Sequence, residues 1–130
     1  MAKTKKQIIY ESRAGKRLAD CFFKLAKEIL ESGKFTIVRA APLSRGRKKY
    51  MGELLLGVKA IYIPPDPLDA QTLFHEMVHI IITGVENYSL KKTREYEKWE
   101  EKIVERITND CWLFFSNAQI TYFRKKLLRS

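Results

Sequence analysis

Apolar residues recur every three or four positions near the start of the chain and predict an amphipathic helix from Tyr10 to Ser32. The residues of this stripe are Ala14, Leu18, Cys21, Phe22, Leu25, Ile29 and Leu30. Gly33 follows, and glycine commonly ends helices. The next segment, KFTIVRA, is a short β-rich run that Pro42 and the basic SRGRKK segment interrupt. We therefore expect a strand followed by a hairpin loop.

A second sheet-forming segment and a second helix follow. YMGELLLGVKAIYIPP supplies one or two strands, with Ile61 and Ile63 on one face, and we expect its AIYI portion at the edge of the sheet. The DPLD segment then begins a helix, with Asp66 as N-cap and Pro67 at the first helical position. Gly84 ends it, so this helix is predicted from about Pro67 to Thr83.

A further long helix is predicted from about Glu95 toward the C-terminus, and Asn117 marks a place where it can break. The order of elements is helix, small sheet, then two helices, which indicates an α+β fold. A chain of 130 residues is about the size of one domain. We expect a single domain over residues 1–130, with a mostly antiparallel sheet and a basic N-terminal segment over about residues 1–9.

The composition of the chain indicates a folded core and a basic surface. Hydrophobic residues make up 45% of the chain, and the net charge is +10, which raises the question of nucleic-acid binding. The basic residues cluster at chain ends and in predicted loops, and no base-reading motif accompanies them. A solvated basic surface is one interpretation. Weak, non-specific contact with nucleic acid or an acidic partner is the other, through Arg45, Arg47, Lys48 and Lys49.

No apolar run has the length of a membrane span, and the N-terminus lacks a signal-peptide core. We therefore expect a cytoplasmic protein with no membrane contact. Cys21 and Cys111 lie in apolar segments without a CxxC partner, and we expect both to be buried free thiols.

The segment TLFHEMVHIIITG holds both histidines of the chain, His75 and His79. Residues four apart share a helix face, so both imidazoles can bind one zinc ion at about 2.0 to 2.1 Å. Glu76 lies about 100° around the helix, where its carboxylate can take a proton from a water bound to the zinc. The resulting hydroxide would attack a peptide carbonyl. An apolar core helix with two hydrogen-bonded histidines is the alternative interpretation.

A catalytic zinc needs a third protein ligand and keeps a fourth position for water. The chain has no further histidine, so a carboxylate must serve. The second long helix offers five candidates: Glu95, Glu97, Glu100, Glu101 and Glu105.

An HExxH helix followed by an acidic helix resembles the gluzincin metallopeptidases, and the nearest patterns are minigluzincins and ImmA/IrrE-like metallopeptidases of phages and other mobile elements. TLFHEMVHII and EEKIVERIT carry the resemblance, which covers about Ile61 to Phe115. It implies a zincin-like domain in which Glu101 binds zinc and Glu105, one turn on, supports a ligand histidine. Glu105 and Glu100 remain alternatives for the zinc ligand.

The sequence thus predicts a zinc metallopeptidase that hydrolyses peptide bonds in a peptide or protein substrate. An extended substrate could add to the AIYI strand. The alternative is a nucleic-acid-associated or regulatory module in which the zinc site is structural or inactive.

Overall fold

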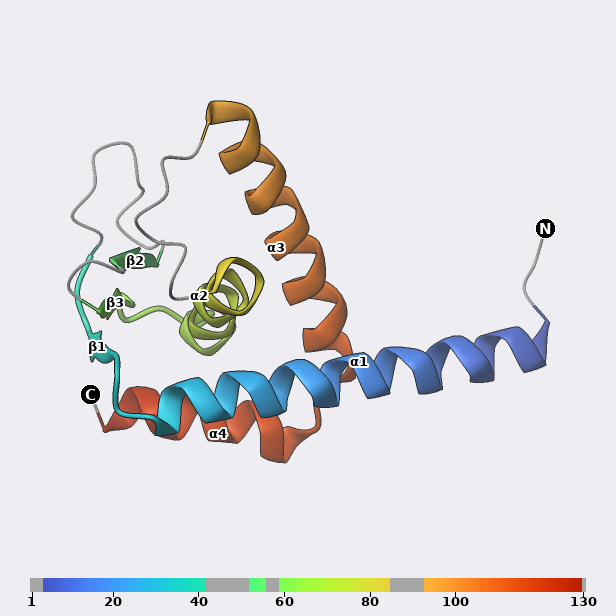
Figure 1. Ribbon diagram of the computed structural model, residues 1–130. Coiled ribbons are helices and arrows are strands. Elements are labelled where there is room, and N and C mark those ends of the chain that lie inside the picture. Colours follow the sequence, from blue (N-terminus) through green and yellow to red (C-terminus); the bar gives the residue numbers. More distant parts are fainter. Residues whose placement is uncertain (1–3, 42–51, 56–58, 85–92, 130) are drawn as a thin grey trace.

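The computed structural model describes residues 4–41, 52–55, 59–84 and 93–129, and Figure 1 shows how they are arranged. The described residues form an α+β fold, as the sequence predicts. Its elements are α1 (Lys5–Glu31), β1 (Thr36–Val38), β2 (Glu53–Leu55), β3 (Ala60–Tyr62), α2 (Asp69–Thr83), α3 (Arg94–Phe114) and α4 (Asn117–Leu128).

The three described strands form a mixed sheet in the order β1-β3-β2. β3 pairs with β1 in parallel, with Ile37 opposite Ile61, and with β2 in antiparallel fashion, with Leu54 opposite Ile61. The expectation of a mostly antiparallel sheet is therefore wrong, and so is the predicted edge position of AIYI. Ile61 is fully buried, which suits a central strand covered on both sides.

Helix α1 begins five residues before the predicted start and ends one residue before the predicted Ser32. Gly33 follows in the left-handed conformation, with φ 73°, which glycine adopts without strain. The buried positions differ from those expected. Ala19 and Ala26 are fully buried, whereas Leu18 is 44% exposed, and Cys21 is exposed rather than buried. The small alanines face the core because they let the neighbouring helices approach closely.

Helix α2 lies between the sheet and α3, with α1 and α4 below it in Figure 1. It begins at Asp69, two residues later than predicted, because Asp66 accepts a hydrogen bond from the Leu68 N–H at 2.8 Å and forms a turn before the helix. On the core side, the Phe74 ring packs edge-on against Phe115 at 4.8 Å between centroids. The same core cluster includes Leu73, Met77, Val78, Val104 and Phe123.

The predicted break in the last helix is confirmed. Helix α3 ends at Phe114, and Ser116 then caps α4, accepting a hydrogen bond from the Gln119 N–H while the Gln119 side chain accepts one from the Ser116 N–H. This reciprocal pair fixes the start of a new helix. Among the described residues, no helix combines the length and apolar character that crossing a bilayer requires.

Candidate metal centre

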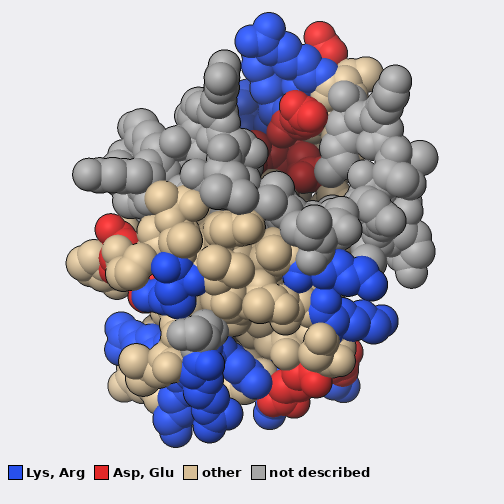
Figure 2. All heavy atoms as spheres, turned by 90° about the vertical axis from the view of Figure 1, so that its left-hand side faces the viewer, with Lys and Arg blue, Asp and Glu red and all other residues tan. Residues whose placement is uncertain are grey.

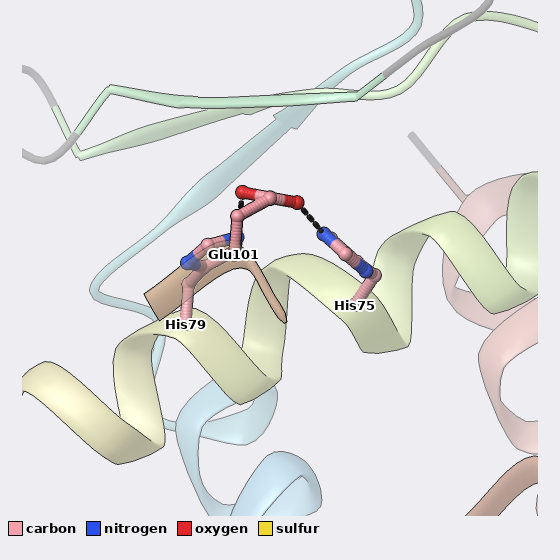
Figure 3. A group of neighbouring side chains, drawn as sticks. All are labelled: His75, His79 and Glu101. Atoms are coloured by element: carbon pink, nitrogen blue, oxygen red, sulfur yellow. Dashed lines mark hydrogen bonds and ion pairs between the residues drawn. The ribbon is translucent and has the colours of Figure 1, made fainter. Parts of the chain in front are cut away.

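His75 and His79 lie one turn apart on α2, and both imidazoles point at one carboxylate of α3 (Figure 3). Glu101 Oε1 lies 2.8 Å from His75 Nε2, and Glu101 Oε2 lies 3.1 Å from His79 Nε2. One ligand atom from each of the three residues lies within 4.8 Å of the other two. Two nitrogens and one oxygen thus converge, from two helices that the sequence separates by more than twenty residues.

His79 is held from its other side as well. Its Nδ1 lies 2.8 Å from Glu100 Oε2, and the two side chains are only 12% and 9% exposed. A carboxylate on the outer nitrogen of a ligand histidine fixes its tautomer and orientation. The resemblance implied Glu105 for this place, but Glu105 is exposed, and Glu100 occupies it.

The physical reason lies in the direction in which each side chain leaves α3. Glu100 lies on the buried face of the helix, with Val104 and Cys111. Glu105 is one residue after Val104, so it is turned about 100° further around the axis toward solvent. Glu100 and Glu101 are also about 100° apart around the axis of α3. Both still contact His79, because the His79 ring lies between their two carboxylates.

These contacts determine the pKa shifts of His79 and Glu101. Burial alone would lower the pKa of His79, but the hydrogen bonds and charges of the surrounding carboxylates outweigh it and hold the pKa above 6.5. Hydrogen bonds from His75 and His79 hold the pKa of the Glu101 carboxyl well below its usual range. Glu101 is therefore ionised at neutral pH.

The two nitrogens of His79 face two different carboxylates, which suits a cation at the centre of the group. A neutral imidazole has one N–H, so it can donate to only one carboxylate. Toward the other, its bare nitrogen needs either an added proton or a metal ion. When Nδ1–H donates to Glu100, the lone pair on Nε2 points toward Glu101 and His75. This is the arrangement that a metal ion requires.

The donor set fits zinc. Zinc binds imidazole nitrogen and carboxylate oxygen, and ligands placed tetrahedrally at about 2.0 to 2.1 Å lie about 3.4 Å apart. His75 and His79 lie 2.8 and 3.1 Å from different oxygens of Glu101, and one ligand atom from each of the three residues lies within 4.8 Å of the other two. Within the described residues the group holds three ligands, the number that a catalytic zinc site takes from its protein.

Glu76 is next to the ligands and is 2% exposed, and its charge contributes to the raised pKa of His79. The backbone of Gly52, directly before β2, lies close to this side chain. A Cβ atom at position 52 would lie 3.1 Å from Glu76 Oε1 and 2.7 Å from Thr72 Cγ2. Sequence reasoning missed Gly52, although a glycine directly before a strand is a signal of close backbone approach.

The candidate nucleic-acid contacts Arg45, Arg47, Lys48 and Lys49 lie outside the described residues. Burial raises the pKa of the Cys111 thiol to about 11, which leaves it protonated and unreactive at neutral pH.

No protein-family model, curated protein or solved structure matches the chain.

Proposed function

We propose that this chain is a zinc-dependent metallopeptidase of gluzincin type with a zincin-like fold, acting in the cytoplasm on peptide or protein substrates. The observation that carries the proposal is the convergence of His75, His79 and Glu101 beside Glu76. A core helix with two hydrogen-bonded histidines would not need both imidazoles to share one carboxylate.

His75, His79 and Glu101 are the residues that would hold the zinc. The chemistry that a bound zinc supplies is a water acidic enough to lose a proton near neutral pH and a polarised carbonyl oxygen. Glu76 takes the proton from the attacking water. The water oxygen bonds to the carbonyl carbon, the C–N bond breaks, and Glu76 delivers the proton to the departing amine nitrogen. Glu100 keeps the ring of His79 in place throughout.

The strand order supports a different place for the substrate than the sequence predicts. β3 is paired on both sides, so it cannot accept a further strand. β2 is an outer strand of the described sheet, and Gly52 at its start lies against Glu76. We propose that an extended peptide adds to the outer edge of β2, because β2 begins beside the carboxylate that moves the proton.

Replacing Glu76 with Gln tests the mechanism. The amide keeps the size of the side chain but cannot accept the proton, so zinc content and folding should persist while peptide hydrolysis falls by about two orders of magnitude or more. The measurement is cleavage of an unfolded protein substrate by zinc-loaded parent and variant at equal concentration. Equal turnover in the two proteins would remove Glu76 from the mechanism.

A further inference from the structure

The helices divide into two layers of opposite charge. The lower layer in Figure 1 consists of α1 and α4 with the following Arg129, and it carries eleven basic and four acidic side chains, a net charge of +7. α2 and α3 carry four basic and eight acidic side chains, a net charge of −4. The candidate metal centre belongs to this second layer. Among the described helices, the positive charge is therefore concentrated away from the candidate metal centre.

The positive layer is held together by side-chain contacts between its two helices. Phe23 of α1 packs edge-on against Tyr122 of α4 at 5.4 Å, and Tyr122 donates a hydrogen bond to Glu31 at 3.1 Å. Asp20 of α1 accepts a hydrogen bond from Gln119 of α4 and pairs with Lys16. Two of the four acidic side chains of the layer are thus engaged within it.

Among the described helices, positive charge is densest on α4 and the Arg129 that follows it. This helix has no acidic residue, and Arg124, Lys125 and Arg129 are all exposed. Among the described residues, none of these three pairs with a carboxylate. On the face in Figure 2, basic side chains gather over the lower part, where α1 and α4 lie, beside a smaller acidic group at the lower right; acidic side chains also lie in a recess in the upper part, below a basic group at the top.

We propose that the exposed face of the α1–α4 layer binds the phosphate backbone of double-stranded DNA without reading its sequence. A row of fixed cations gains affinity by displacing the counterions that phosphates hold. Arg124, Lys125 and Arg129 start within about 7.5 Å along the helix axis, a length over which the two strands of B-DNA together present about four phosphates. A duplex releases more counterions per neutralised phosphate than a single strand does, which favours the duplex as the ligand.

An anionic membrane is the competing partner, and the packing of α4 argues against it. Helices that lie on membranes insert an apolar face between the lipids. The apolar face of α4 is already used, because Phe123 is fully buried and Leu127 is 5% exposed in the protein core. Leu128, 84% exposed, is the one exposed large apolar side chain among the described residues of α4, so this helix offers charge for phosphates but a single leucine for insertion.

The test compares two variants that lose equal charge from opposite layers. One carries Arg124→Gln, Lys125→Gln and Arg129→Gln on the α4 side. The matched control carries Lys98→Gln, Lys102→Gln and Arg106→Gln on the exposed side of α3. Binding to a short mixed-sequence DNA duplex is measured by fluorescence anisotropy from about 50 mM to about 200 mM salt. Thermal unfolding shows that each variant is folded.

The parent protein should bind the duplex more weakly as salt rises. Removing three phosphate contacts should make the slope of log K against log salt shallower by about 2.7 in the α4 variant, and the α3 control should keep the parent slope. A charge-preserving variant, Arg124→Lys with Arg129→Lys, should also keep it. The proposal is wrong if the parent shows no salt-dependent binding, if both triple variants weaken equally, or if the parent binds phosphatidylserine vesicles but not the duplex.

Discussion

At His79, each ring nitrogen faces its own carboxylate, and the two carboxylates have different tasks. Glu101 also faces His75, so it belongs to the candidate ligand set, whereas Glu100 contacts the outer nitrogen of His79. Loss of a ligand removes a bond to the metal. Loss of the outer carboxylate only loosens the orientation of one ligand. The two replacements should therefore differ in severity.

We expect Glu101→Ala to abolish stoichiometric zinc binding, because two histidines alone are too few ligands for tight binding. Glu100→Gln should keep the site but weaken zinc binding about ten- to a hundredfold. Glu105→Gln is the matched control, since Glu105 is exposed on the same helix, and it should bind zinc as the parent does. Zinc affinity is measured by competition with a chromophoric chelator. A larger loss at Glu105 than at Glu100 would contradict the assignment.

Gly52 gives a second prediction at this scale, because its backbone leaves no room for a side chain beside Glu76. A Cβ atom there would press on Thr72 and on the Glu76 carboxylate, so Gly52→Ala must displace Glu76. We expect peptide hydrolysis to fall at least about tenfold, since small misplacements of a catalytic group are costly, while zinc content stays that of the parent. Full activity in this variant would contradict the expectation, because it would show that peptide hydrolysis does not depend on the close approach of residue 52 to Glu76.

The residues of the site were predictable to the extent that helix periodicity determines them. His75, Glu76 and His79 lie on one helix, so their relative directions follow from their spacing. The roles of Glu100 and Glu105 depend on the rotation of α3 about its own axis. That rotation is set by packing of Val104, Thr108 and Cys111 against the rest of the core, and a single sequence does not reveal it.

Among the elements, the helices were predicted and the strand order was not. The break at the α3–α4 corner was predicted near the right place, because the SNAQ segment there forms a capping box, a local interaction. The order β1-β3-β2 depends instead on pairing between strands distant in the sequence. Strands of three residues carry too little alternation of apolar and polar residues to specify their partners. A hairpin was therefore expected where β3 in fact separates β1 from β2.

Helix packing gives a prediction at Gly15 of α1. A side chain at this position would overlap the ring of Phe114 at the end of α3. We expect Gly15→Leu to lower the free energy of unfolding by about 1–3 kcal/mol, the usual cost of overpacking. Ala14→Leu is the control, since Ala14 is exposed on the same helix, and its effect should stay within about 0.5 kcal/mol. Urea unfolding measures both; an equal effect would show that α3 does not depend on close approach at Gly15.

In the molecule as a whole, the candidate metal centre joins α2 to α3, and the basic layer lies away from it. A zinc ion bound by residues from both helices would stabilise the folded state over the unfolded chain. Catalysis and contact with a polyanion would then use different surfaces. Variants of α4 should leave zinc content unchanged, and variants of the metal site should leave duplex binding unchanged wherever the protein still folds.

The central claim is that His75, His79 and Glu101 bind one zinc ion, and metal analysis of the purified protein tests it most directly. We expect one zinc per chain in the parent protein, and no stoichiometric zinc in His75→Ala or in His79→Ala, because each variant loses one of three protein ligands. Thermal stability should fall together with zinc content. A parent protein that neither purifies with zinc nor takes it up, or a histidine variant that retains full occupancy, would contradict the account.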